Sequence, residues 1–340
     1  MNDPDHLLDL SPEQRKIVES IDFQGLVYLV TACAGAGKTR TLSHIVIKAL
    51  SQLQKDFEKR NRGGDGQPVR PGKLLLLTAT RAAKEEAMAR VVALQEVLHK
   101  NGMDPGGRLR PECVRTIHSL ALCILKDNVR EHHPGGIVNI VGQNDILEML
   151  YSILEGVHLG KCDSQAAKDL FCDIGIDEQA EILAEMRTER LKQFVPVVQE
   201  KDSLGPYAAL VLQQLEIMLE GGRVKTGEEA DGEEGGGGAD PPPFPVGPSS
   251  ASAPPPSDGK VVVKGDFNAL VYGLAESKYP VCSKGDILIV DEGQDLSLTQ
   301  MEIILTAAEH SASIVVLGDD SQGIHVFSGA VSRTLHTLMR

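Results

Sequence analysis

Hydrophobic positions in the first 125 residues alternate between short continuous runs and runs with helical spacing. Residues 26–31 are apolar and rich in β-branched and aromatic side chains, which indicates a buried strand. From Lys38 to Leu53, apolar side chains recur every three or four residues, which predicts a helix. The alternation continues with a strand at 73–78, a helix at 81–101, and a strand and helix within 114–125. Strands that alternate with helices predict a parallel α/β sheet.

Shorter signals mark helix starts and loops. In the segment Ser11-Pro12-Glu13-Gln14, serine is the expected N-cap, proline stands at the first helical position, and glutamine completes a capping box. We therefore expect a helix to about Ser20. Two stretches rich in glycine, proline and charge, 60–72 and 102–111, indicate surface loops.

The pattern changes in the middle of the chain. Between about 126 and 221 the apolar positions keep helical spacing and no convincing strand is visible, which predicts a helical insertion. Residues 222–260 collect Gly, Pro, Ser and acid; this composition predicts a disordered linker, or alternatively an interaction tail. Apolar strands resume at 286–290 and 313–317. We expect one α/β domain from 1–125 and 261–340, interrupted by 126–221 and 222–260.

Composition sets broad limits. The chain has 340 residues, of which 41% are hydrophobic, so it can form one large or two ordinary domains. Six cysteines form no CxxC pair and no apolar leader is visible, which favours a reducing intracellular compartment. No run approaches the roughly 20 apolar residues of a membrane span. The Gly/Pro/acid segment is typical of eukaryotic chains and favours the nucleus over the cytoplasm.

The net charge of −14 opposes contact with nucleic acid only in part. Part of the excess lies in the linker, where seven acids face three basic residues: Glu228, Glu229, Asp231, Glu233, Glu234, Asp240 and Asp258 against Arg223, Lys225 and Lys260. Because an electrostatic field is local, an acidic protein can still carry a basic groove. The net charge therefore does not decide whether the partner is a nucleic acid.

The sequence ACAGAGKT at residues 32–39 stands where a strand becomes a helix, the context of a phosphate-binding loop. Glycines allow backbone N–H groups to face phosphates, and the helix N-terminus adds partial positive charge. In such a loop Lys38 binds the β- and γ-phosphates of ATP and Thr39 holds Mg²⁺. The nucleotide-binding backbone is then that of Ala34, Gly35, Ala36 and Gly37. The alternative is a chance Gly-rich turn.

Two acids follow a buried strand at 287–290. Asp291 is suited to bind Mg²⁺, directly or through water, and Glu292 to polarise the water that attacks the γ-phosphate. Alone, such a pair is more often a solvated turn or a helix cap. Its combination with the phosphate loop favours a catalytic site.

Further motifs carry a resemblance. Residues 291–295 (DEGQD), 318–322 (GDDSQ) and 327–330 (FSGA) resemble motifs II and III of UvrD/Rep-type superfamily 1A DNA helicases. Gln14 stands at the family's Q motif, residues 77–81 (LTATR) resemble motif Ia, and 116–122 (TIHSLAL) resemble motif Ib. The resemblance implies a RecA-like P-loop NTPase fold, with the helical insertion equivalent to the family's 1B subdomain.

The resemblance also implies roles. Gln14 would hold adenine, Arg40 would support the nucleotide pocket, and Gln294 and Gln322 would sense the γ-phosphate, with Lys38, Asp291, Glu292 and Gln322 catalytic. Single-stranded DNA, alone or at junctions, would contact Thr78, Thr80, Arg81, Thr116, His118, Ser119 and Phe327. The implied activity is ATP- and Mg²⁺-dependent 3′ to 5′ translocation with strand separation.

Several of these residues have simpler explanations. Gln14 can serve only as the capping-box partner of Ser11, and His118 can be a hydrogen-bonded structural histidine. Thr78 and Thr80 are ordinary residues for a strand end.

The chain also departs from the family pattern. Ala79 replaces a usual Phe, His325 a usual Tyr and Ser328 a usual Arg, whereas Phe327 keeps an aromatic residue. Aromatic stacking on bases contributes roughly 1–3 kcal/mol per base. The residues therefore support ATP hydrolysis better than tight or processive DNA binding.

The sequence ends at Arg340, directly after motif III, and motifs IV to VI are absent from it. We expect a fragment of a longer protein that contains a second RecA-like domain. Two other functions fit the same residues: the motor part of a RecB-type helicase–nuclease, and a nucleotide-binding regulatory module without motor activity.

Overall fold

The computed structural model describes residues 10–33, 35–63, 70–132, 137–158, 175–198, 206–219 and 262–319. Contacts between residues divide the chain into two compact units. The first comprises Met1–Leu120 and Lys278–Arg340, and we call it the sheet unit. The second, Ala121–Ser277, is called the helical unit. The expected linker, 222–260, lies outside the described residues.

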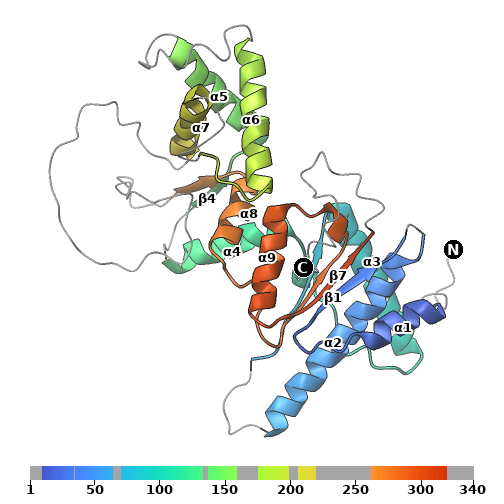
Figure 1. Ribbon diagram of the computed structural model, residues 1–340. Helices are drawn as coiled ribbons and strands as arrows, with labels where there is room; N and C mark the ends of the chain where they lie inside the picture. Colours follow the sequence, from blue (N-terminus) through green and yellow to red (C-terminus); the bar gives the residue numbers. More distant parts are fainter. Residues whose placement is uncertain are drawn as a thin grey trace. The chain divides into compact units, whose positions relative to one another are not determined.

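The sheet unit is built on five parallel strands in the order β1-β7-β6-β2-β3. Figure 1 shows β1 beside β7, although the two strands come from opposite ends of the chain. The strands are β1 (Val27–Thr31), β2 (Leu74–Thr78), β3 (Val114–Thr116), β6 (Ile287–Val290) and β7 (Ser313–Gly318). The predicted parallel α/β sheet is confirmed.

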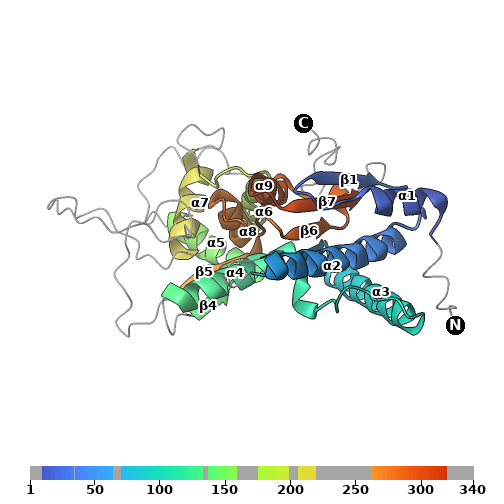
Figure 2. The same ribbon diagram turned by 90° about the horizontal axis from the view of Figure 1, so that it is seen from below.

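Both faces of the sheet are covered, which explains why the central strands are continuously apolar. Leu76, Ile289 and Val315 belong to one buried cluster with residues of α2 (Lys38–Gly63) and α3 (Arg81–Lys100). Figure 2 shows both helices on the same side of the strands. Helix α1 (Pro12–Ser20) packs along α2, and α9 (Leu298–Glu309) packs against β7. Two short 3-10 helices, η2 (Pro111–Cys113) and η4 (Gly293–Asp295), precede β3 and α9.

Helix α2 continues to Gly63, beyond the expected loop start at residue 60. Its last three turns consist largely of Gln, Lys, Glu and Arg, which favour helix. Side chains four residues apart also interact there: Gln54 donates to Glu58 at 3.2 Å, and Arg62 pairs with Glu58. Charge alone was therefore a poor loop signal.

The helical unit contains α4 (Ile117–His132), which begins in the sheet unit, and α5 (Gln143–His158), α6 (Ile176–Lys192), α7 (Pro206–Leu219) and α8 (Phe267–Glu276). It also contains a two-stranded parallel sheet of β4 (Ile137–Ile140) and β5 (Val262–Gly265), which the sequence did not predict. Residue contacts place the second segment of the sheet unit from Lys278, whereas the sequence analysis expected a return to the α/β domain at residue 261. Because β5 pairs with β4 and α8 packs against α6, residues 262–277 belong to the helical unit.

A buried ion cluster joins three helices of this unit. Arg187 of α6 donates through Nε to Glu216 of α7 at 2.6 Å, and through a terminal nitrogen to Asp266. Asp266 is the N-cap of α8 and accepts the N–H groups of Asn268 and Ala269. The guanidinium thus fixes the residue at which α8 begins.

Within the described part of the chain, no helix combines the length and the apolar character that a membrane crossing requires.

Candidate nucleotide-binding site

The carboxyl ends of the strands gather the residues of the predicted site. In a parallel sheet these ends lie at one edge, where ligands of open α/β folds bind. Strand β1 ends at Thr31 and leads through the phosphate loop into α2, and β6 ends at Val290, directly before Asp291 and Glu292. Strand β7 lies between them, and the N–H of Ala32 donates to Gly318 at 3.0 Å.

The phosphate loop depends on two glycines. Gly35 and Gly37 have φ angles of +76° and +78°, a conformation that residues with a Cβ rarely adopt. At Gly37 an added Cβ would lie 2.4 Å from the side-chain nitrogen of Gln14. Lys38 and Thr39 then begin α2, so both stand at the positive end of the helix. Ala34 lies outside the described residues.

Gln14 has two contacts. Its Oε1 accepts the N–H of Ser11 at 2.9 Å, and its own N–H donates to Ser11 Oγ at 3.2 Å, so the capping box exists. Its Nε2 donates to the carbonyl of Ala36 at 2.8 Å. Gln14 therefore both caps α1 and braces the phosphate loop, and its adenine contact remains a prediction.

Lys38 and Glu292 form an ion pair across 254 residues of sequence. Lys38 is largely buried, with 15% of its side chain exposed, and Glu292 is half-buried. The backbone of Glu292 is left-handed, with φ 55° and ψ 45°, which is uncommon for a residue with a long side chain. This turn directs the carboxylate of Glu292 to the lysine at the start of α2.

Gln294 holds the same carboxylate from the other side. Its Nε2 donates to Glu292 Oε2 at 2.7 Å, and its Oε1 accepts the N–H of Asp319 at 3.0 Å. The side chain is buried, so both ends of the amide are satisfied within the protein. The sequence missed this contact, because it depends on the end of β7 lying beside β6.

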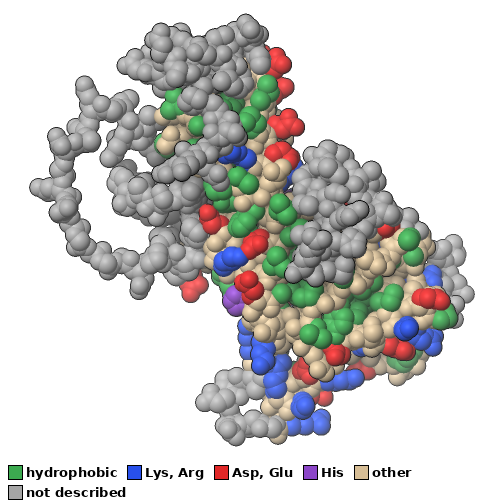
Figure 3. Space-filling model, viewed as in Figure 1, with side chains coloured by type: hydrophobic (Ala, Val, Ile, Leu, Met, Phe, Trp, Pro, Cys, Tyr) green, Lys and Arg blue, Asp and Glu red, His purple; other side chains and the backbone are tan. Residues whose placement is uncertain are grey.

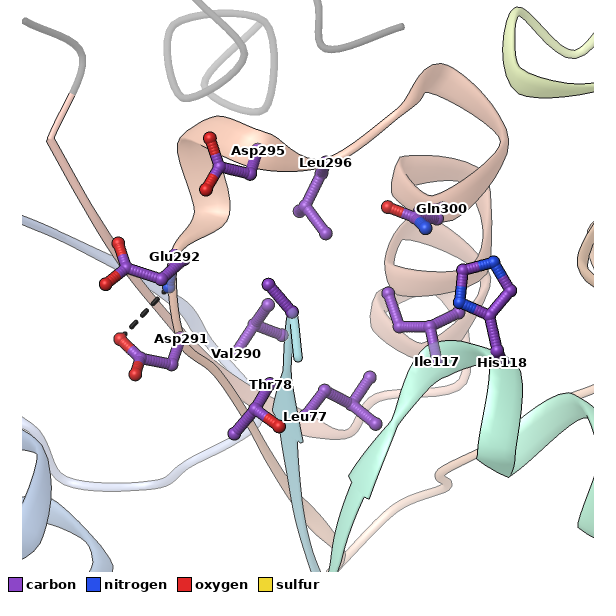
Figure 4. A pocket seen from close by; sticks show the side chains of 11 residues that line it. Leu77, Thr78, Ile117, His118, Val290, Asp291, Glu292, Asp295, Leu296 and Gln300 are labelled. Carbon is purple, nitrogen blue, oxygen red and sulfur yellow. Dashed lines mark hydrogen bonds between the residues drawn. The ribbon is translucent and has the colours of Figure 1, made fainter. Parts of the chain in front are cut away.

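Asp291 is the most perturbed carboxyl group of the site. Burial and the neighbouring charge of Glu292 raise the pKa of Asp291 to about 6, although Lys38 opposes the shift. Its Oδ1 accepts the N–H of Glu292 at 3.0 Å (Figure 4). A buried carboxylate beside a second carboxylate favours a cation, so Asp291 fits a Mg²⁺ ligand.

Mg²⁺ commonly uses one or two protein carboxylates together with substrate phosphates and water. The described residues contain no group of three or more His, Cys, Asp or Glu side chains suited to a metal. Thr39, the other predicted ligand, is half-buried in the first turn of α2.

The threonines of the predicted DNA track have structural contacts. Thr78 is buried and donates to the carbonyl of Thr80 at 3.2 Å, and Thr80 is the N-cap of α3. Thr116 accepts the N–H of Ser119 at 3.2 Å at the start of α4. Arg81 is exposed. These contacts stabilise strand ends and helix starts, and the DNA contacts remain predictions; Gln322 and Phe327 lie outside the described residues.

A small cavity of about 80 Å³ adjoins the two acids. Figure 4 shows Thr78 at the end of β2, His118 at the start of α4 and Gln300 on α9 around it. Ala79 also lines this cavity. The replacement of an expected Phe by Ala therefore falls beside Asp291 and Glu292.

A glycine-rich loop between a strand and a helix, with paired acids at the end of a second parallel strand of the same sheet, defines a P-loop NTPase of the RecA-like class. The model of the UvrD/REP helicase N-terminal domain matches residues 10–340. The chain belongs to this family, which confirms the resemblance and supports a helicase function that uses ATP, a divalent metal and DNA. No curated protein matches the chain.

Proposed function

We propose that the chain hydrolyses ATP to drive 3′ to 5′ movement along single-stranded DNA and separation of the strands at junctions. The observation that carries the ATPase part is the contact of Lys38 with Glu292 beside the buried Asp291. This brings a phosphate-binding cation, a base and a metal ligand to one edge of the sheet. The direction of movement rests on the family resemblance.

Each group has a proposed role. Lys38 and the backbone of residues 34–37 bind the phosphates, Gln14 and Arg40 hold the rest of the nucleotide, and Thr39 and Asp291 hold Mg²⁺. The metal neutralises phosphate charge. Glu292 accepts the proton of the attacking water, and Gln294 keeps its carboxylate oriented. Gln322 is proposed to sense the γ-phosphate.

The ion pair joins two groups that both have partners in the proposed reaction. Lys38 and Glu292 neutralise each other in this pair. Phosphates offer Lys38 a second anionic partner, which releases the carboxylate of Glu292 to bind water. Gln294, which is anchored on Asp319, prevents the released side chain from turning away.

The remaining assignments follow the family. We propose that the sheet unit is the 1A domain and that the helical unit corresponds to 1B. Single-stranded DNA would pass the carboxyl edge of the sheet near β2 and α4, at residues Thr78, Thr80, Arg81, Thr116, His118 and Ser119. Arg81 is exposed there and can contact phosphates. Phe327, which lies outside the described residues, is a further proposed DNA contact.

Nucleotide binding and hydrolysis by the 340-residue chain test the ATPase. Lys38→Ala should abolish binding of a fluorescent ATP analogue. Glu292→Gln should keep binding and lower hydrolysis by about 10²–10⁴-fold, the usual contribution of a general base. Lys55→Ala, an exposed lysine of the same helix, is the matched control. Wild-type nucleotide affinity in Lys38→Ala would contradict the proposal.

DNA retention separates the motor from a regulatory module. A labelled single-stranded oligonucleotide should be retained in a nucleotide-dependent manner, and Arg81→Ala should weaken retention while nucleotide binding is unchanged. Nucleotide binding without any retention of single-stranded DNA would favour the regulatory module.

A further inference from the structure

A second concave site lies at the opposite edge of the sheet, among the segments that precede the strands. It is a groove with a volume of about 1000 Å³. One wall is the C-terminal half of α2, with Asp56, Lys59 and Arg60, and the other consists of turns before β1, β6 and β7. Because Lys38 lies at the carboxyl edge of the same parallel strands, this amino-edge groove is separate from the nucleotide site.

The amino-edge groove carries three exposed cations: Lys59, Arg60 and Lys284. None of them forms an ion pair with another described residue. Arg60 Nε donates to the carbonyl of Asp56 at 3.2 Å. The terminal nitrogens of Arg60 lie over Gly285, since a Cβ added there would be 3.6 and 3.7 Å from them. The guanidinium is therefore anchored on the helix and directed across the groove.

Only one carboxylate, that of Asp56, lies among the described residues that line the groove, and its Oδ1 accepts the side-chain N–H of Gln52 at 3.0 Å. Three cations thus face one acid, in a chain whose net charge is −14. Figure 3 shows Lys and Arg side chains gathered over the C-terminal part of α2, low in the view. Because fields are local, this concentration attracts polyanions.

The shape and composition of the groove restrict the class of ligand that it can bind. Gly25 and Gly285 have φ angles of +74° and +87°, so these turns stay without side chains, and the N–H of Gly25 is held by Ser313 Oγ at 2.8 Å. The only aromatic residue among those that line it, Phe23, is buried and offers no face for a base. Exposed cations without an aromatic stacking platform suit contacts to a charged backbone, which position a nucleic acid without reading its sequence.

We propose that the amino-edge groove binds the phosphodiester backbone of DNA, without sequence preference, as a contact separate from the predicted strand track. The choice of DNA among polyanions rests on the proposed function, because that activity brings DNA to this chain. Electrostatic contacts of this kind position a nucleic acid and make its binding dependent on salt.

The test is fluorescence anisotropy with the nucleotide-free 340-residue chain, using duplex DNA and a single strand of equal length at several salt concentrations. The variant neutralises the groove through Lys59→Gln, Arg60→Gln and Lys284→Gln. The matched control neutralises two exposed lysines and one exposed arginine elsewhere in the sheet unit, through Lys16→Gln, Lys100→Gln and Arg108→Gln. Melting followed by circular dichroism establishes that each triple variant is folded. If a triple variant is not folded, the corresponding single substitutions are measured in its place.

We expect the groove variant to bind DNA about tenfold more weakly at low salt, with a smaller loss at high salt, and the control to lose much less. Each lost phosphate contact should lower the slope of log affinity against log salt by about 0.9 for duplex and about 0.7 for single-stranded DNA. A loss of affinity for the duplex alone would show that the groove binds duplex DNA. A loss of affinity for both probes would show that it binds either form of DNA.

Wild-type affinity and slope in the groove variant, for both probes, would overturn the proposal. A competition experiment compares a polyglutamate peptide with unlabelled DNA at equal concentrations of negative charge. If the peptide displaces the labelled DNA more effectively than unlabelled DNA does, the proposal is overturned in favour of an acidic protein partner. Binding of an ATP analogue is measured in parallel and should be unchanged in the groove variant. A failure of the groove is thereby distinguished from a failure of the nucleotide site, which Lys38→Ala reports.

Discussion

Two clusters of one cation and two carboxylates, one in each unit, have the same composition and different geometry. In the helical unit, Arg187 contacts Glu216 and Asp266 through separate nitrogens. In the sheet unit, Lys38 contacts Glu292, whereas burial and the like charge of Glu292 raise the pKa of Asp291 to about 6. The numbers of cations and carboxylates in a cluster therefore do not decide whether every carboxylate contacts a cation.

The two clusters also differ in the geometry of the cation. A guanidinium is a planar fork with five donors and can hold two carboxylates at once, whereas an ammonium is a compact point charge. Arg187 joins α6, α7 and α8, a structural task. The lysine cluster leaves a carboxylate that favours an additional cation, which is the requirement of a magnesium site. In one cluster both carboxylates contact the cation, and in the other Asp291 has no hydrogen bond to it.

Removal of the Arg187 guanidinium should give the largest effect on the free energy of unfolding. Arg187→Met leaves Glu216 and Asp266 without their cation and should lower the free energy of unfolding by about 3–5 kcal/mol. Urea unfolding followed by circular dichroism measures the change. The control is Lys192→Met, which removes a half-exposed pair with Glu189 and should cost under about 1 kcal/mol. A similar small loss in both variants would mean that the arginine cluster is not structural.

The carboxylates can be neutralised in the same background. Arg187→Met combined with Glu216→Gln and Asp266→Asn should recover most of the lost stability, since the cost of the single change comes from uncompensated charge. Asn at position 266 keeps an oxygen for the N-cap of α8. Failure to recover would assign the loss to packing of the arginine stem.

In the sheet unit, removal of a charge should stabilise the protein. The pKa of Asp291 in the fold, about 6, exceeds its ordinary value of 3.8, so the folded state favours the protonated form. This contribution is complete below about pH 4 and is lost as the pH rises through about 6. Asp291→Asn remains neutral and should therefore exceed wild type above that range by up to about 3 kcal/mol.

Thermal and urea unfolding without nucleotide and metal, at about pH 4 and about pH 8, measure this effect. The two proteins should be equally stable at the lower pH and should diverge at the higher pH. If the difference in stability between Asp291→Asn and wild type does not change with pH, the surroundings of Asp291 do not oppose ionisation of its carboxyl group. Asp295→Asn, in the same segment, is the matched substitution.

Gln294 tests whether the lysine cluster needs an internal support. Gln294→Leu leaves the buried N–H of Asp319 without its acceptor and should cost about 1–3 kcal/mol. It should also lower the rate of ATP hydrolysis roughly tenfold at unchanged nucleotide affinity, because Glu292 loses its orientation.

The matched variant for this position is Gln294→Glu, whose carboxyl group can donate to Glu292 only when it is protonated. Its activity relative to wild type should rise as the pH falls, while that of Gln294→Leu should not change with pH. Equal pH profiles for the two variants would contradict an orienting role for Gln294.

The sequence predicted the sheet because its central strands are buried on both faces and are therefore continuously apolar, as at 74–78 and 287–290. It missed β4 and β5, since four-residue strands more than a hundred residues apart carry no local period. The motifs located Lys38, Asp291 and Glu292. The contact of Lys38 with Glu292 and the orientation of Gln294 could not be predicted, because they depend on β7 lying between β1 and β6.

The smallest change isolates the geometry of the cation from its charge. Arg187→Lys keeps one positive charge but replaces the fork with a single ammonium, as at Lys38 in the other cluster. We expect a loss of about 1–2 kcal/mol in urea unfolding, smaller than for Arg187→Met, because one of the two carboxylates loses a charge-assisted hydrogen bond. The stability of this variant should also fall as the pH rises from about 4 to about 7, since the abandoned carboxylate would then resist ionisation. A variant as stable as wild type at both pH values would show that an ammonium serves two carboxylates as well as a guanidinium does. The raised pKa of Asp291 would then be due to its burial and to the charge of Glu292, and not to the type of cation.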